Sequence, residues 1–193
     1  FSLDNDRTTL SDEPGEDDLR SRAGRLALTY TGWQAADIEL SVSTLMADSV
    51  YSYDEDWSYV GIAPGWEYSS FDAYARERDD QTLELRVVSQ QPFMLAQRET
   101  DWLAGLYIYD RDENLRRDFY NWDIDQQDVF SSDYVSEHRA LYGELTHHLS
   151  SAWQITAGAR YERYDNDYND SNQVQANPSD TMWGGRLSLS YLP

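Results

Sequence analysis

The stretch Trp153-Gln154-Ile155-Thr156-Ala157-Gly158-Ala159-Arg160-Tyr161-Glu162 alternates strictly between two kinds of side chain. Its odd-numbered residues are apolar or aromatic, and its even-numbered residues are glycine, polar or charged. Successive side chains of an extended strand point to opposite faces, so this stretch predicts a β-strand with one apolar and one polar face. A helix would need an apolar repeat every three to four residues, which the stretch lacks.

The same alternation recurs along the chain, and no helical period of any length accompanies it. With the stretch at 153–162, these segments predict about seven strands over residues 24–193. The run 102–109 is apolar on both faces, so its orientation stays open. The apolar positions of the other segments are Leu26, Leu28, Tyr30; Ile38, Leu40, Val42, Thr44, Met46; Leu83, Leu85, Val87; Leu141, Gly143, Leu145; and Trp183, Leu187, Leu189, Tyr191.

The connections between these segments alternate in length. Short ones fall near 34–37, 91–101 and 149–152, and long outer loops are expected at 48–81, 110–138 and 165–181. Residues 1–23 are acidic and are expected to form a loop or linker. Tight turns at one end and long loops at the other are typical of transmembrane barrels. The sequence therefore predicts an all-β fold, an antiparallel up-and-down meander forming part of a transmembrane β-barrel.

The charges within the strands follow the same division of faces. A charged side chain on a lipid-facing position near mid-bilayer costs a few kcal/mol, whereas on a wet lumen wall it can hydrate or pair across strands. We therefore expect the apolar face to contact lipid and the polar face to line a lumen. The charged residues expected to face the lumen are Glu84, Arg86, Glu144, Arg160, Glu162 and Arg186.

Composition excludes several classes of protein. The 36 Asp and Glu residues outnumber the 15 cationic residues, all of them Arg, and leave a net charge of −21. Such a chain is repelled by phosphate backbones, so no nucleic-acid partner is expected. The absence of cysteine excludes thiolate metal sites and cysteine nucleophiles. No apolar run approaches the length of a transmembrane helix.

Aromatic residues make up 14% of the chain and are dominated by 15 Tyr and 7 Trp, whose apolar rings carry polar tips. They fall at two levels of the predicted barrel, which predicts two membrane-interface girdles. Near the short turns lie Trp33, Trp102, Trp153 and Tyr191; near the long loops lie Tyr51, Tyr53, Tyr109, Tyr161, Tyr164 and Trp183.

No catalytic constellation is present, so we expect no enzyme and no catalytic residues. The nucleophile elbow, the glycine-rich phosphate loop and the His-Glu-x-x-His motif are all missing. His147 and His148 are neighbours on a strand and point to opposite faces, so one metal cannot readily use both. No built metal site and no resident cofactor are expected.

Acidic clusters in the outer loops could still hold Ca²⁺ loosely, because carboxylate oxygens are its usual ligands. The clusters are Asp54-Glu55-Asp56, Asp123-Ile124-Asp125 with Asp128, and Asp165-Asn166-Asp167 with Asn169 and Asp170. The last one matches the start of an EF-hand loop, but Asp170 occupies the glycine position and Ala176 the bidentate glutamate position. A solvated, charge-dense loop is the plainer interpretation.

Aromatic residues in the outer loops are the candidate ligand contacts, because flat rings with polar tips suit sugars or aromatic siderophores. The alternative is that they pack the loops together over the barrel mouth. Arginines suited to an anionic ferric siderophore are also available, although the net acidity opposes that choice. The candidate contacts are Tyr51, Tyr53, Trp57, Trp66 and Trp122; the arginines are Arg76, Arg78, Arg111, Arg116 and Arg117.

The chain contains the runs 101–109 (DWLAGLYIY), 140–146 (ALYGELT) and 153–162 (WQITAGARYE), preceded by 81–87 (QTLELRV). These runs resemble consecutive barrel strands of TonB-dependent outer-membrane receptors. The first contains the family's W-x-x-G-x-Y pattern. The individual words are degenerate, and their order and spacing over residues 24–193 make the match specific.

The resemblance implies a 22-stranded barrel around an N-terminal plug, which imports a scarce ligand of the siderophore, cobalamin or glycan class. It also implies an outer-membrane location in bacteria, contact with outer-membrane lipid and energy supplied through the TonB complex. With about seven strands and no recognisable plug, this chain is expected to be a fragment of such a receptor.

A different class of protein remains open from the pattern alone. A secreted or periplasmic β-sandwich would also bury one face of each strand, and it could bind carbohydrate through its aromatic loops. A sandwich requires a second sheet against the apolar face, whereas a barrel wall leaves that face uncovered by protein.

Overall fold

The computed structural model describes residues 11–192 and consists of β-strands joined by turns and loops. The strands are β1 (Asp17–Tyr30), β2 (Ala36–Asp54), β3 (Ser70–Ser89), β4 (Phe93–Leu95), β5 (Arg98–Asn121), β6 (Gln126–His148), β7 (Trp153–Asp170), β8 (Gln175–Ala176) and β9 (Ser179–Tyr191). Seven of them are long, in agreement with the predicted number. No helix of the described residues is long and apolar enough to cross a membrane.

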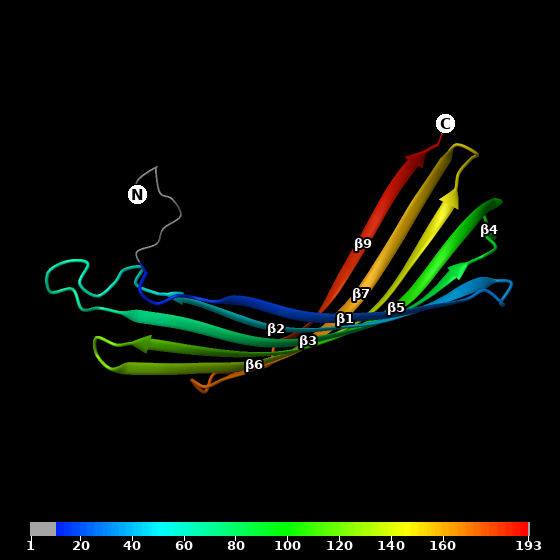
Figure 1. Ribbon diagram of the computed structural model, residues 1–193. Helices are drawn as coiled ribbons and strands as arrows, with labels where there is room; N and C mark the ends of the chain where they lie inside the picture. The colour runs from blue at the N-terminus through cyan, green and yellow to red at the C-terminus, as the bar shows by residue number, and fades with distance from the viewer. Residues whose placement is uncertain (1–10, 193) are drawn as a thin grey trace.

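All nine strands belong to one sheet that bends along its length (Figure 1). The long strands pair antiparallel with their neighbours in chain order, while β4 pairs only with β5 and β8 only with β7. Over residues 11–192 the sheet has a single layer, with β1 and β9 at its edges. This is the predicted up-and-down meander. The β-sandwich alternative is not favoured, because the described part of the chain contains no second sheet that covers the apolar face.

The register aligns the apolar residues of all seven long strands. One row runs across the whole sheet and is made of Leu28, Leu40, Leu85, Leu106, Leu141, Tyr161 and Trp183. Its members do not form a protein core: Leu141 is 61% and Trp183 is 77% exposed. Among residues 11–192 the only buried hydrophobic residues are Ala36 and Ala140. The sheet therefore carries a broad apolar face that no other part of the described chain covers.

The predicted long loops are wrong in extent, because the strands continue well into them. The connections shrink to 55–69, 122–125 and 171–178, and Asp17–Ala23 belongs to β1 rather than to a linker. Residues 1–10 of the predicted linker lie outside the described residues. Beyond the apolar rows both faces of each strand carry polar groups, as in the run 110–118 of β5. The apolar alternation therefore ends before the backbone pairing does. A strand segment that is polar on both faces has the same kind of sequence as a loop.

The predicted outer aromatic girdle is also wrong in part. Tyr161 and Trp183 lie on the apolar face, where their rings are 4.6 Å apart between centroids. Tyr109 and Tyr164 instead flank His138 on the charged face, and Tyr51 and Tyr53 share that face. A one-residue change of position along a strand moves a side chain to the other face. Nearness to a loop therefore did not decide which face these rings occupy.

Candidate functional site

The charged face of the sheet carries the six residues expected to line a lumen, and polar contacts within and between strands hold their side chains. Glu144 forms an ion pair with Arg186, and Arg160 donates to Glu162 over 2.7 Å between Nε and Oε2. These residues come from β6, β7 and β9.

The remaining two of the six, Glu84 and Arg86, continue this face across β3. Tyr142 donates its hydroxyl hydrogen bond to Glu84, and Arg86 forms a 3.4 Å ion pair with Glu39 of β2. The alternation in sequence therefore placed all six charged residues on one face.

Gly105 of β5 has no side chain and leaves room for a tyrosine ring at the centre of this face. A Cβ built on Gly105 would lie 2.3 Å from Cζ of Tyr142, so the glycine is needed for the tyrosine ring to cross β5. Arg160 lies over both Tyr142 and Tyr107, at 5.9 Å and 5.1 Å from the ring centroids. These cation–π contacts hold the guanidinium against the wall.

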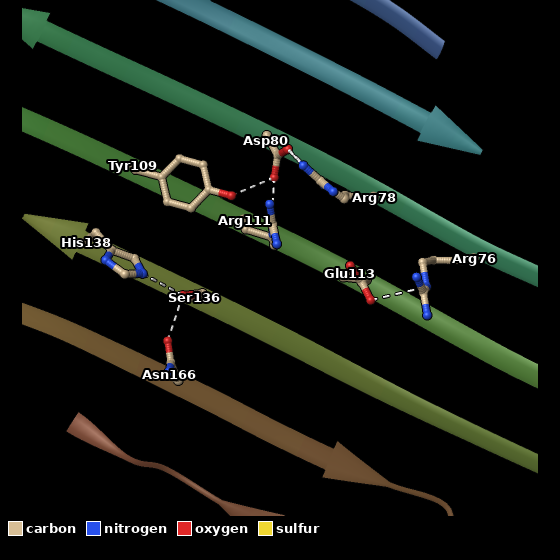
Figure 2. A network of polar contacts seen from close by, with 9 residues as sticks. All are labelled: Arg76, Arg78, Asp80, Tyr109, Arg111, Glu113, Ser136, His138 and Asn166. Carbon is tan, nitrogen blue, oxygen red and sulfur yellow. Dashed lines mark hydrogen bonds and ion pairs between the residues drawn. The ribbon is translucent and has the colours of Figure 1, made fainter. Parts of the chain in front are cut away.

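Farther toward the long-loop ends, Asp80 of β3 gathers three hydrogen-bond donors (Figure 2). Arg111 donates through Nε over 2.8 Å and Tyr109 through its hydroxyl over 3.0 Å, both from β5. Arg78, on the same strand as Asp80, completes the set. The aspartate side chain is nearly buried, so its charge is neutralised by groups that also tie β3 to β5.

Figure 2 also shows a second set of polar contacts, between β6 and β7. Ser136 donates to the side-chain oxygen of Asn166 over 2.6 Å and hydrogen-bonds with Nε2 of His138. The other ring nitrogen of His138 lies 2.8 Å from Glu162. Polar contacts thus join β3 to β5 and β6 to β7, and the rings of Tyr109 and His138 meet between the two sets at 5.6 Å between centroids.

One arginine of this region is bound more tightly than the others. Arg117 makes two hydrogen bonds of 2.7 Å and 2.6 Å to Asp72, which is 1% exposed. Its guanidinium also lies over the rings of Tyr74 and Phe119, at 5.6 Å and 5.5 Å. Arg117 is therefore part of the wall rather than a free cation.

Three of the five predicted ligand contacts lie close together near the loop ends of β2. Tyr51 and Tyr53 are 5.6 Å apart between ring centroids, and Trp57 follows Tyr53 at 6.3 Å. The two tyrosines line a hollow of about 360 Å³ on the charged face. Its other lining residues are Ser49, Tyr74, Arg76 and Leu115.

The other two predicted contacts lie elsewhere. Trp66 donates its indole hydrogen bond to Ser58 within the loop 55–69. Trp122 stacks on Tyr120 at 6.0 Å and contacts Phe71, and the register places these two rings on the opposite face from Tyr53. Trp122 therefore does not share a site with the tyrosines of the hollow.

Only Arg76 among the five arginines considered for an anion keeps a largely free guanidinium on this wall. Its Nε forms one ion pair, 3.3 Å long, with Glu113, and its side chain is half exposed. Arg78, Arg111 and Arg117 are committed to buried aspartates, as described above. Arg116 pairs with Asp118 on the other face of β5.

The acidic cluster 54–56 is organised around hydrogen bonds to its own loop. Asp56 accepts from the backbone of Ser58 and of Ser70, and these bonds lower its pKa although partial burial acts to raise it. Glu55 accepts from the hydroxyl of Ser70 over 2.7 Å, and Asp54 accepts from the backbone of Trp57.

Over residues 11–192 no group of three acidic or histidine side chains is arranged to hold a metal ion. Calcium binding in these loops stays a prediction without an assembled site.

Sequence reasoning missed Asp72, Asp80 and Tyr74, which organise the wall near its loop end. They fall in the segment that was expected to be loop. The signal that could have found them is the alternation of Ser70, Asp72, Tyr74 and Arg76, all on one face of a strand whose other face carries Phe71, Ala73 and Ala75.

Solved structures of two iron-uptake proteins are among those that share this fold. The unliganded ferric citrate transporter FecA superposes with a TM-score of 0.72 over 90% of this chain at 13% identity. The ferric yersiniabactin uptake receptor FyuA from Yersinia pestis gives a TM-score of 0.51 over 93% of this chain at 17% identity. The chain covers only 25% and 33% of these two proteins. No curated protein matches it.

The family described as TonB dependent receptor-like, beta-barrel matches residues 1–193, the whole chain. Its members are receptors of the outer membrane rather than enzymes, in agreement with the location and the lack of a catalytic site inferred from the sequence. The open meander, its uncovered apolar face and its charged opposite face are what a stretch of such a barrel wall requires. The chain belongs to the TonB-dependent receptor β-barrel family.

Proposed function

We propose that this segment is part of the wall of an outer-membrane receptor that binds a small-molecule ligand and imports it with energy from the TonB complex. The apolar face contacts outer-membrane lipid, and the charged face lines the lumen. The row of apolar residues from Leu28 to Trp183 supports this orientation, because it is continuous over seven strands and none of its members is buried. Such a surface is stable only against another apolar medium.

The ligand contacts we propose are the tyrosines of the hollow together with Arg76. This hollow carries the proposal, because Tyr51, Tyr53 and Tyr74 bring phenol groups to one place beside a guanidinium with unused donors. Of the siderophore, cobalamin and glycan classes, this combination favours an anionic ferric siderophore. Rings supply a flat contact surface, and the guanidinium supplies charge-assisted hydrogen bonds to carboxylate or phenolate oxygens. The two structural neighbours, which handle ferric citrate and ferric yersiniabactin, agree with an iron chelate.

The test compares substitutions in the full-length receptor that contains this segment. Tyr53→Ala and Arg76→Gln should each weaken binding of ferric citrate, used as an anionic probe, by about tenfold, because each removes a contact to an acceptor-rich ligand. Arg78→Gln and Tyr120→Ala are the matched controls, since Arg78 is committed to Asp80 and Tyr120 lies on the other face. Binding is measured by fluorescence titration and import by uptake of radioactive iron.

A neutral ferric trihydroxamate serves as the second probe. If Arg76→Gln weakens binding of the anionic and the neutral chelate equally, the proposed role of Arg76 in charge recognition is wrong. If the wild-type receptor binds neither chelate, the siderophore class is wrong. Tyr120→Ala with an effect as large as Tyr53→Ala would contradict the assignment of the hollow as the ligand site.

A further inference from the structure

The short-turn end of the sheet carries a small hairpin that the receptor function leaves unexplained. Strand β4 pairs with the first residues of β5, so that Phe93 lies opposite Thr100 and Leu95 opposite Arg98. The turn between them is Ala96-Gln97, and both residues have positive φ, 48° and 64°. Positive φ at both central residues is typical of the tight two-residue turns that join antiparallel strands. The hairpin therefore extends beyond the wall formed by β3, β5 and β6.

The register assigns the side chains of this hairpin to faces of the sheet. Thr100 lies opposite His147 and Trp102 opposite Leu145, which is on the apolar face. Phe93 and Leu95 therefore continue the apolar face, and Met94 lies on the other side. Phe93 also lines a common hollow with Trp102, Ala104 and Leu145. The apolar face thus extends from the wall onto β4.

All three residues of β4 expose apolar surface. Phe93, Met94 and Leu95 are 41%, 64% and 47% exposed. Three consecutive large apolar residues in a water-filled space would favour association with another apolar surface.

Strand β4 also covers a polar pair that sits on the apolar face. Thr100 is fully buried, and its hydroxyl lies 2.8 Å from Nδ1 of His147. Its two cross-strand neighbours are Phe93 on one side and His147 on the other. Polar groups in an apolar medium are costly unless they hydrogen-bond to each other. Phe93 and the hydrogen bond together make this part of the face compatible with a lipid environment.

We propose that the β4–β5 hairpin is an interfacial anchor that lies in the periplasmic leaflet of the outer membrane. Phe93 and Leu95 insert beside the acyl chains, and Arg98, opposite Leu95, meets the lipid phosphates. The inference rests on the proposed contact of the apolar face with lipid, with which the hairpin is continuous. Aromatic residues at the same end of the sheet agree with this depth: Trp102 follows the hairpin in β5, and Trp153 and Tyr191 pack at 4.8 Å.

The experiment places nitroxide labels on the full-length receptor in vesicles of phosphatidylethanolamine and phosphatidylglycerol. This chain contains no cysteine, and any cysteines elsewhere in the receptor are replaced by serine. Single variants Phe93→Cys and Leu95→Cys test the apolar side, and Met94→Cys and Glu99→Cys are the matched controls on the other side of the same hairpin. Collision rates with oxygen, which enriches in lipid, and with a water-soluble nickel complex are measured by electron paramagnetic resonance.

The expected result is a several-fold higher ratio of oxygen to nickel collisions at positions 93 and 95 than at positions 94 and 99. Equal access of the nickel complex to all four labels would overturn the anchor, as would labels at 93 and 95 that neither reagent reaches, since those would be covered by protein. A label at Leu145→Cys, within the wall, shows whether a negative result concerns the hairpin alone or the whole apolar face. If its label also meets nickel rather than oxygen, the proposed lipid-facing side of the whole wall is wrong.

Discussion

At the scale of single residues, the wall depends on close pairs between neighbouring strands. Asp72 is almost completely buried, whereas its partner Arg117 keeps part of its side chain in solvent. The two halves of this pair are therefore not equivalent. A charge that can hydrate when its partner is removed costs little, and one that cannot is strongly destabilising.

This asymmetry gives a direct prediction. Arg117→Met should lower the free energy of unfolding by about 2–3 kcal/mol, because it removes two charge-assisted hydrogen bonds from a buried carboxylate and leaves it the hydroxyl of Tyr74 as donor. Asp72→Asn should cost about 1 kcal/mol, because Arg117 can turn toward water. Both are measured by guanidinium unfolding of the receptor in vesicles. Equal costs for the two variants would show that Arg117 is as confined as Asp72.

A second prediction concerns the glycines of the charged face. Gly105→Ala should destabilise the receptor by about 1–3 kcal/mol, because the new methyl group displaces the Tyr142 ring and breaks its hydrogen bond to Glu84. Gly184→Ala is the matched control, since a Cβ there meets no atom within 4 Å. A similar loss for both variants would point to backbone freedom rather than to the space that Tyr142 occupies.

At the scale of elements, the loop 55–69 shows how acidic side chains can shape a connection without a metal. Asp56 accepts hydrogen bonds from Ser58 and Ser70, which ties the start of the loop to the start of β3. These bonds lower the pKa of Asp56 in the folded state below its ordinary value of 3.8.

The lowered pKa sets the direction of a pH effect. The stabilisation from Asp56 is fully present above pH 3.8, the ordinary value for its carboxyl group, and is lost as the pH falls through its lower pKa in the folded state. Hydrogen exchange at the amide of Ser70 should therefore become faster as the pH is lowered through that range, after correction for the intrinsic rate. In Asp56→Asn this pH-dependent part should disappear; its persistence would mean that another group holds the loop.

Some features of the strands follow from the sequence, and others do not. Strand number, antiparallel order and the faces of Glu84, Arg86, Glu144, Arg160, Glu162 and Arg186 could be predicted, because a two-residue period is a direct consequence of extended backbone. The strand ends could not, because the alternation of apolar residues reports the medium on each face rather than the backbone pairing. Beyond Ile108, β5 continues to Asn121 with polar groups on both faces. For the same reason, the sequence predicted only part of the hollow beside Tyr53, since Tyr74 and Arg76 lie in the polar part of β3 that was expected to be loop.

At the scale of the whole molecule, residues 11–192 form no protein core, and their stability must come from pairing between strands and from the medium around them. Leu187 on β9 is 73% exposed. In water, replacing such a leucine by arginine would be nearly neutral, because surface substitutions away from buried groups usually change stability by less than about 0.5 kcal/mol. On a lipid-facing position, the same replacement costs about 2–4 kcal/mol at mid-bilayer.

Leu187→Arg therefore distinguishes the two media. We expect the free energy of unfolding of the variant receptor in vesicles to be lower by about 2–4 kcal/mol than that of the wild type. We also expect the variant to reach the outer membrane in smaller amounts. Ser188→Arg is the matched control, because the next residue of the same strand faces the opposite side, beside Arg186 and Ser190. If Leu187→Arg is tolerated as well as Ser188→Arg, the apolar face of this sheet is covered by water or by protein rather than by lipid, and the orientation of the wall is wrong.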